Sequence, residues 1–149
     1  MKIISTYPAK IKESSGAFEA TAVLYRQAVD YFIGIMLKHW DKQFASLPNI
    51  NVVTRQTELL CWPTSKRPLT QYDFGKSFYK FPSYLRRAAI SEAYGMVSSY
   101  HTRLKQWKAS PQGKEPGLPK VGRTFPAMYR EVMFKNTTDR YTVRIKVFI

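Results

Sequence analysis

The sequence has few of the residues on which enzyme sites and disulfide scaffolds depend. Because Cys61 is the only cysteine, the chain cannot form an internal disulfide and has no second thiol for a zinc or redox motif. The two histidines, His39 and His101, are far apart and lack the spacing that places two imidazoles on one metal ion. The seven glycines are isolated or lie in one proline-rich segment, so the chain has no glycine-rich phosphate loop.

Acidic residues are also scarce and do not cluster. Metal-dependent cleavage of a phosphodiester needs carboxylates that converge on one or two cations, usually from the ends of neighbouring strands. Of the ten acids, only Glu131 falls in a stretch that is predicted to be a strand. Ion pairing explains these residues better than metal binding does. We therefore expect no metal site, no cofactor and no catalytic residue in this chain.

Long apolar runs are absent. The N-terminus has no apolar run of signal-peptide length, and no stretch approaches the roughly 18 apolar residues of a membrane span. Together with the single cysteine, this favours a soluble protein of a reducing, cytoplasmic compartment that does not bind membranes. The 44% of hydrophobic residues is enough to form the core of one domain.

Basic residues are plentiful. Lys and Arg number 24 against 10 Asp and Glu, which gives a formal net charge of +14 and a pI near 10.0. So large an excess makes a polyanion, above all a nucleic acid, the leading partner, although a solvated basic surface is the alternative.

Hydrophobic periodicity predicts a strand, two long helices and a hairpin. We expect a short strand in residues 1–11, then a turn at residues 13–16 and a helix from about Gly16 to Phe44. The buried face of that helix should carry Phe18, Ala22, Tyr25, Val29, Phe32, Met36 and Trp40. Between 45 and 82, NVVTRQTELL fits a short helix or a strand, and LTQYDFGKSFY fits a short helix around Gly75.

The second long helix should begin after Pro82, with Ser83 as its N-cap, and end near Ser110–Pro111. Its predicted core stripe is Leu85, Ala89, Glu92 or Ala93, Met96, Tyr100, Leu104 and Trp107. Residues 111–123, PQGKEPGLPKVGR, should form an exposed and mobile linker.

The C-terminal region should be a hairpin made of AMYREVMF, a turn at residues 135–139, and the alternating strand from Tyr141 to Ile149. A lone hairpin is marginally stable in water. We therefore expect it to pair with the N-terminal strand, and the native protein to continue beyond residue 149.

Cations and aromatics gather in two places. On the second long helix, the face opposite the predicted core stripe should display Arg86, Arg87, Tyr94, His101, Lys105 and Lys108, with Arg103 at its boundary, and the linker adds Lys114, Lys120 and Arg123. A second cluster upstream comprises Lys66, Arg67, Tyr72, Lys76, Tyr79 and Lys80. Cations that follow a phosphate backbone, beside aromatics that stack on bases, are typical of nucleic-acid sites. Tyr94 fits stacking and packing equally well, whereas Tyr100 fits packing better.

A family resemblance rests on the run FPSYLRRAAISEAYGMVSSYHTRLKQW, the Gly/Pro/Lys linker, YREVMFKN and the alternating strand that follows. This order resembles the N-terminal half of the transposon-encoded TnpB proteins and of their descendants, the compact type V CRISPR effector nucleases. The resemblance implies an α+β fold in which a helical recognition domain, residues 13–110, is inserted into a small, here incomplete, β-barrel wedge domain formed by residues 1–12 and 125–149. Residues 111–124 would be the flexible basic linker.

The resemblance also implies a function. In that family these parts hold a guide RNA and its heteroduplex with target DNA, and read a short motif beside the target, while base pairing reads the remaining sequence. By position, motif contacts would fall on Tyr72, Ser83, Arg86, Lys135 and Asn136. Arg86 would contact either a guanine edge or a phosphate. The RuvC nuclease domain, where Mg²⁺ would bind, is not in these residues, so the full-length protein, not this chain, would be the DNA endonuclease, in the nucleoid of a prokaryotic cytoplasm.

Two other functions compete with this interpretation. The chain could be a structural RNA-binding protein that works without a nuclease partner, or a nuclease in its own right. In the leading interpretation, the rest of the same polypeptide or a second copy would complete the barrel.

Overall fold

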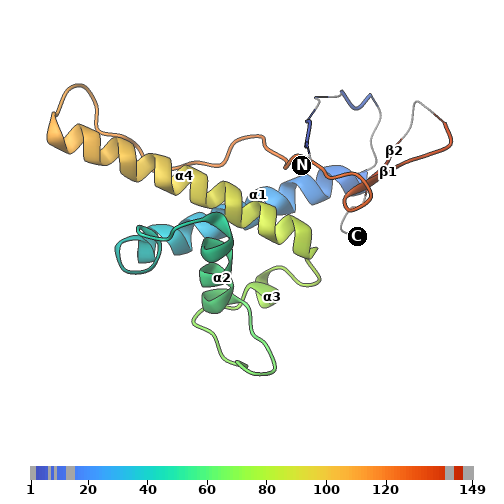
Figure 1. Cartoon of the computed structure of the whole chain (residues 1–149), viewed down its shortest axis with the longest axis horizontal. Helices are drawn as coiled ribbons and strands as arrows, with labels where there is room; N and C mark the ends of the chain where they lie inside the picture. Colours follow the sequence, from blue (N-terminus) through green and yellow to red (C-terminus); the bar gives the residue numbers. More distant parts are fainter. Residues whose placement is uncertain (1–2, 7, 9, 13–15, 140–142, 146–149) are drawn as a thin grey trace.

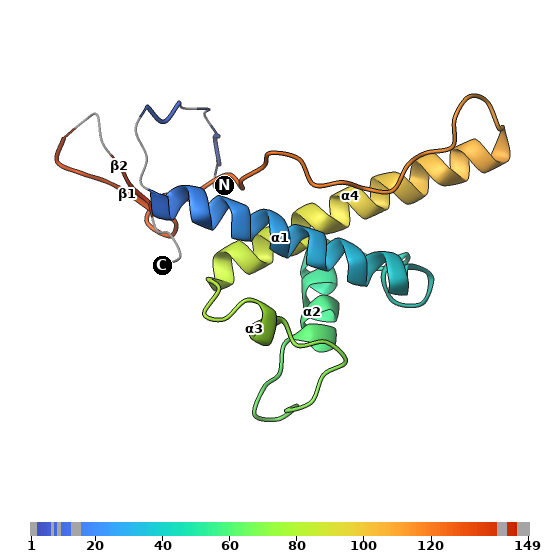
Figure 2. The same cartoon turned by 180° about the vertical axis from the view of Figure 1, so that it is seen from behind.

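The structure is a computed structural model that describes residues 3–6, 8, 10–12, 16–139 and 143–145. Its elements are α1 (Gly16–His39), η1 (Trp40–Phe44), α2 (Ile50–Cys61), α3 (Phe74–Ser77), α4 (Ser83–Ala109), β1 (Phe134–Asn136) and β2 (Val143–Ile145). Helix α1 packs along α4, α2 and α3 lie on one side of this pair, and the β1–β2 hairpin lies beyond the first turn of α1 (Figures 1 and 2). No helix of the described ranges is long and apolar enough to cross a membrane.

Helix α1 forms as its sequence predicts. All the expected stripe residues from Ala22 to Trp40 are buried, and Phe18 is half-buried against Phe125, with ring centroids 5.2 Å apart. The helix continues past His39 as the π-helical turn η1, so the predicted end at Phe44 is confirmed. The three- and four-residue spacing places the predicted stripe residues on one face of the helix, which is why the prediction held.

Side-chain caps start the two short helices. The Asn49 Oδ1 accepts a hydrogen bond of 3.1 Å from the Val52 N–H at the start of α2, and the Asp73 Oδ1 accepts one of 3.0 Å from the Lys76 N–H in α3. Each cap satisfies a backbone donor that has no partner within its helix. The open choice for NVVTRQTELL is thereby decided in favour of a helix, and the expected helix around Gly75 is confirmed.

The buried stripe of α4 is rotated relative to the prediction. Leu85, Ala89 and Ala93 are buried as expected, but the stripe then runs through Ile90 and Val97. The residues expected to continue it, Met96, Tyr100, Leu104 and Trp107, are only half-buried. Ser83 is the first residue of the helix and Pro82 occupies the N-cap position, so the predicted cap was wrong by one residue.

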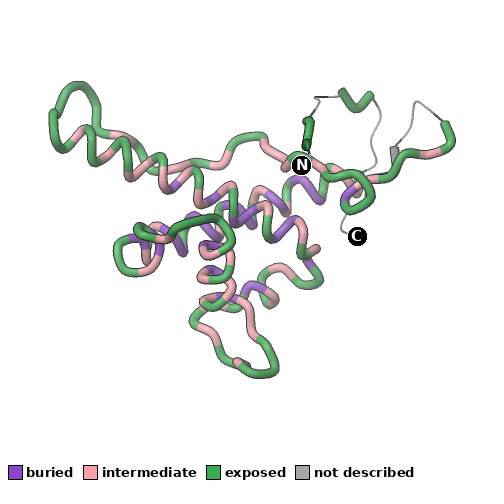
Figure 3. Tube along the Cα trace, in the orientation of Figure 1, coloured by how far each residue is buried: buried purple, intermediate pink, exposed green. Residues whose placement is uncertain are grey.

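Burial ends partway along α4. Val97 is the last buried residue of the helix, and the remainder of α4 projects from the core, as Figure 3 shows by its change from purple to pink and green. The segment after α4 then runs back beside the helix (Figure 1). It is exposed for most of its length, as expected, but it is also held in place. The Trp107 indole donates a hydrogen bond of 3.3 Å to the Gly113 carbonyl, and the Arg26 Nε donates one of 3.2 Å to the Thr124 carbonyl.

A C-terminal hairpin is present, but its limits differ from the prediction. Strands β1 and β2 are antiparallel, with Lys135 opposite Arg144. Lys135 and Asn136 therefore belong to a strand, and the prediction that they form the turn was wrong. AMYREVMF is not a continuous strand either, because residues 131–133 form a turn in which Glu131 has a φ of 67°. This left-handed conformation is uncommon for a residue other than glycine, and it removes Glu131 from any strand.

The N-terminal strand is not found in the residues that the structure describes. Residues 3–6, 8 and 10–12 have no strand pairing, and Ile3 is 80% exposed. The rest of the expected strand, the turn at residues 13–15 and most of the last predicted strand lie outside the described residues. The α+β class is confirmed, with four α-helices and a two-stranded sheet in the described part of the chain.

Candidate nucleic-acid interface

The projecting part of the molecule carries dense positive charge. We call residues 98–124, which comprise the end of α4 and the segment that returns beside it, the basic arm. Its cations are Arg103, Lys105, Lys108, Lys114, Lys120 and Arg123, and its one acid is Glu115. All six cations are exposed, as the sequence predicted. The arm combines many cations with little competing negative charge, which is the arrangement that attracts a phosphate backbone.

These cations have no acidic partner within the described residues. The ion pairs found there involve Arg86, Arg130 and Lys135. Arg103 and Lys120 come from the two sides of the arm and line one groove of about 520 Å³. Gly95 and the small side chains of Ser91 and Ser99 leave space in it, and Glu92 lies along its wall. The groove therefore brings two unpaired cations to a surface that a polyanion can approach closely.

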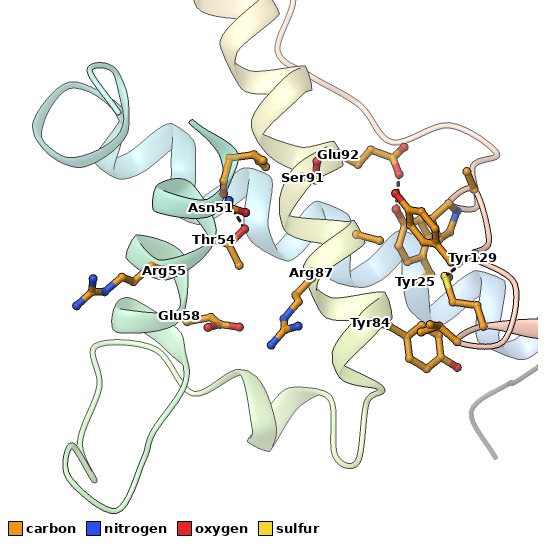
Figure 4. Close-up of a pocket in the computed structure, with 16 residues that line it drawn as sticks. Tyr25, Asn51, Thr54, Arg55, Glu58, Tyr84, Arg87, Ser91, Glu92 and Tyr129 are labelled. Carbon is orange, nitrogen blue, oxygen red and sulfur yellow. Dashed lines mark hydrogen bonds between the residues drawn. The ribbon is translucent and has the colours of Figure 1, made fainter. Parts of the chain in front are cut away.

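A larger trough of about 750 Å³ lies next to the arm, over the first half of α4. Its centre is the α4 surface around Arg87, Ala88 and Ser91, one side is α2, and the other side is the segment 126–133 (Figure 4). The trough is therefore an open channel across α4 that elements from distant parts of the sequence assemble.

Cations occupy the α2 side of the trough. The exposed residues Arg55 and Arg87 both line the trough. Arg87 extends into the gap between α2 and α4, close to Glu58, whereas the Arg55 guanidinium points from α2 away from α4 (Figure 4). The Glu58 carboxylate already binds the guanidinium of Arg86 at 3.0 Å. Arg55 and Arg87 have no ion-pair partner in the described part of the chain, so this side of the trough offers two guanidinium groups to an anion.

Aromatic and apolar groups occupy the opposite side of the trough. Tyr129 is 60% exposed and Val132 is 51% exposed, and Tyr84 lies nearby (Figure 4). At the same side the Tyr25 hydroxyl donates a hydrogen bond to the Glu92 carboxylate. Burial and this carboxylate raise the pKa of Tyr25 far above its usual value, so the hydroxyl stays protonated and keeps donating.

Arg86 is buried, so its predicted place on the exposed face of the second long helix was wrong. The residue is 6% exposed. Its guanidinium binds Glu58 and lies over the Trp62 ring, with the Cζ atom 3.9 Å from the ring centre. The prediction failed because the partners that make burial of this cation possible come from α2 and the residue after it, far away in the sequence.

His101 and Tyr94 pack toward the body of the protein rather than outward, so their predicted exposure was wrong. The His101 ring stacks on Trp40 with centroids 4.7 Å apart and planes 5° apart, and the Tyr94 ring lies 5.7 Å from Trp40. Burial lowers the pKa of His101, which Lys108 lowers further and Asp41 partly restores. Of the two interpretations that were open for Tyr94, packing is the one the structure supports.

The remaining predicted residues are dispersed over the molecule. Tyr72 is half-buried, and its hydroxyl lies 2.8 Å from the His39 Nε2. Lys76 and Ser83 are exposed but lie outside the arm and the trough. Lys135 is exposed in β1 and lies 4.0 Å from the Glu131 carboxylate, and Asn136 is exposed beside it.

The upstream cluster contains both residues that stabilise the fold and residues that lie on the surface. Arg67 donates a hydrogen bond of 3.0 Å to the Trp62 carbonyl and so closes the loop after α2. Tyr79 is 71% exposed, and the Lys80 ammonium lies 5.3 Å from the centre of its ring. Within the described ranges, no three His, Cys, Asp or Glu side chains are grouped so that they could hold a metal ion.

Sequence reasoning missed Arg55, Tyr84 and Tyr129. Arg55 lies in the stretch whose helix or strand character was open, and Tyr129 was assigned to a strand that does not form. The Asn49 cap before an apolar period was the signal that could have placed Arg55 on a helix surface. No local signal could have placed residues 126–133 opposite α2, because only the return of the chain along α4 brings them there.

The chain shares sequence with other proteins over most of its length. An uncharacterized protein of Aquifex aeolicus (strain VF5), aq_aa04, is 27% identical, in an alignment that covers 83% of this chain and 80% of that protein. No solved structure matches the chain. The model of the Aq_aa04 family matches residues 5–149. The chain therefore belongs to the Aq_aa04 family.

Proposed function

We propose that this chain is a nucleic-acid-binding module that holds RNA, or a duplex containing RNA, by its basic arm, and that it carries out no catalysis. The observation that carries the proposal is the arm itself. Its six cations are exposed and have no acidic partner in the described residues, on a chain with a formal net charge of +14. Unpaired cations along a projecting element bind phosphates and release the counterions that phosphates hold.

The finer proposal follows the family resemblance. The chain would be the guide-RNA-binding and target-binding region of a TnpB-like RNA-guided DNA endonuclease, with cleavage and its Mg²⁺ supplied by a RuvC domain outside these residues. The β1–β2 hairpin would then belong to a wedge barrel that strands from outside the described residues complete. Long α4 and the arm would lie along the guide RNA or its heteroduplex, whose shape and backbone such proteins recognise.

One observation favours a second candidate, a structural RNA-binding protein that acts without a nuclease domain. The match covers 80% of the aq_aa04 protein. Only about a fifth of that relative therefore lies outside the matched region. If no nuclease domain acts with this chain, nucleic-acid binding would be its whole activity. Both candidates use the basic arm, and they differ in whether a nuclease domain acts with it.

Charge removal on the arm tests the shared part of the proposal. Binding of a fluorescein-labelled 20-nucleotide RNA to the full chain is measured by anisotropy for the wild type and for a Lys105→Ala, Lys108→Ala double variant. We expect the double variant to bind at least about fivefold more weakly at low salt. A matched control, Lys10→Ala with Lys12→Ala, removes the same charge from exposed residues near the N-terminus. If control and arm variants lose equal affinity, the arm is not the binding element.

A further inference from the structure

We propose that the trough over α4 is a site for single-stranded nucleic acid, in which phosphates bind Arg55 and Arg87 on the α2 side and an unstacked base lies on Tyr129 on the opposite side. This inference rests on the proposed function and deepens it, because the arm binds a phosphate backbone of any form whereas the trough selects strands with free bases. Figure 4 shows the two arginines and Tyr129 on opposite sides of α4.

The distribution of charge in the trough determines on which side the phosphates of a bound strand lie. Both carboxylates that line the trough are engaged, Glu58 by the buried Arg86 and Glu92 by the Tyr25 hydroxyl. Arg55 and Arg87 keep their charge for a ligand, and a guanidinium matches two phosphate oxygens at once. Glu92 lies on the Tyr129 side, where its negative charge repels phosphate (Figure 4). Phosphates are therefore favoured only on the side next to α2.

The aromatic side explains why the strand must be single. Tyr129 and Val132 present more than half of their surface to solvent, across the trough from the arginines (Figure 4). Exposed aromatic rings next to cations are the platforms on which single-strand binders stack bases. A double helix keeps its bases stacked and paired inside two rows of phosphates, so it cannot place a base on Tyr129. The neighbouring small residue Ser91 leaves the centre of the trough open for the sugar and backbone.

Affinities for a single strand and a duplex provide the test. A 12-nucleotide RNA and the same RNA annealed to its complement are titrated into the full chain. We expect Tyr129→Ala to lower single-strand affinity by about tenfold, the effect of losing one stacked base, and to change duplex affinity by less than about twofold. Tyr129→Phe keeps the ring and should bind as the wild type does. Tyr79→Ala, which removes a ring that is exposed outside the trough, should leave both affinities unchanged.

A second pair of variants separates this proposal from the one on which it rests. Arg55→Ala should weaken the single strand more than the duplex, whereas Arg123→Ala, on the basic arm, should weaken both to the same degree. If Arg123→Ala acts as expected but Tyr129→Ala changes single-strand affinity by less than twofold, the trough is not the site and the arm remains the binding element. If the chain binds neither RNA form, both proposals fail.

Photochemical crosslinking locates the contact directly. An RNA single strand with one 5-iodouridine is irradiated with the full chain, and the crosslinked peptide is identified by mass spectrometry. We expect a crosslink at Tyr129 that disappears in Tyr129→Ala and is outcompeted by unlabelled single strand. Crosslinks that fall only on Tyr79 or other surface tyrosines would overturn the assignment of the trough.

Discussion

The guanidinium of Arg86 joins α4 to α2, because its Nη2 atom lies 3.0 Å from the Glu58 Oε1 while its Cζ atom lies 3.9 Å from the centre of the Trp62 ring. The Arg86 side chain is 8% exposed and that of Glu58 is 26% exposed, so the pair is largely shielded from water. A cation that looks like a ligand contact in the sequence is therefore part of the core. The same pair neutralises the carboxylate that would otherwise reduce the positive charge of the trough.

Replacing Arg86 should damage stability rather than recognition. Arg86→Ala leaves the Glu58 carboxylate partly buried without its counter-charge, and loss of one partner of such a pair costs about 3 kcal/mol. Urea unfolding followed by circular dichroism measures this change. Glu58→Gln with Arg86→Met, which removes both charges together, should cost less. Nucleic-acid affinity of the folded fraction of Arg86→Ala should fall less than that of Arg87→Ala. The opposite order would return Arg86 to the binding surface.

Cys61 should be inert in the folded protein. Burial raises the pKa of its thiol to about 12, with Arg86 opposing this shift and Glu58 and Asp73 adding to it. Because the thiolate is the reactive species, a disulfide reagent at pH 8 should modify native protein at least about 100-fold more slowly than protein in 8 M urea. Reaction at equal rates in the two conditions would mean that the region around α2 opens readily.

Stability should depend on the protonation of His101. Burial lowers its pKa in the folded state below the usual value near 6.5, so the unfolded chain takes up the proton at a higher pH than the folded chain does. The free energy of unfolding is therefore expected to fall as the pH drops below about 6.5. His101→Phe keeps a ring on Trp40 but cannot be protonated. Its loss of stability between pH 7.5 and pH 5 should be smaller than that of the wild type, as measured by urea unfolding.

Charge on the arm should contribute additively to salt dependence. Each cation that contacts a phosphate contributes about 0.7–0.9 to the slope of log affinity against log salt concentration. Lys114→Ala and Lys120→Ala should each reduce that slope by about that amount, and together by about twice as much. Anisotropy titrations at several salt concentrations measure it. A slope that is unchanged in both single variants would show that these residues make no phosphate contact.

The sequence predicted those parts of the fold whose buried side chains all follow one apolar periodicity. The stripe from Ala22 to Trp40 is apolar throughout, so its periodicity determines the buried face of α1. The buried stripe of α4 was misjudged because Arg86 and His101 are polar, and their partners Glu58, Trp62 and Trp40 come from other elements. The sequence predicted where the hairpin lies but not where its first strand begins, because nothing in the sequence predicts a positive φ at Glu131.

The candidate site was predictable to a similar extent. The cations of the basic arm could be identified from composition and from the proline- and glycine-rich segment that carries half of them. The trough could not, because it exists only where α2 and residues 126–133 meet across α4. Nothing in the sequence distinguishes Arg55 or Tyr129, and only the fold brings both residues to the same trough.

The salt dependence of nucleic-acid binding tests the central claim most directly. The affinity of the wild-type chain for a labelled 20-nucleotide RNA is measured between 50 and 200 mM salt. With four or more cations of the arm on phosphates, the affinity should fall by at least about 50-fold over this range, along a straight line of log affinity against log salt. An affinity that stays constant over the range, or no binding at 50 mM, would contradict the account.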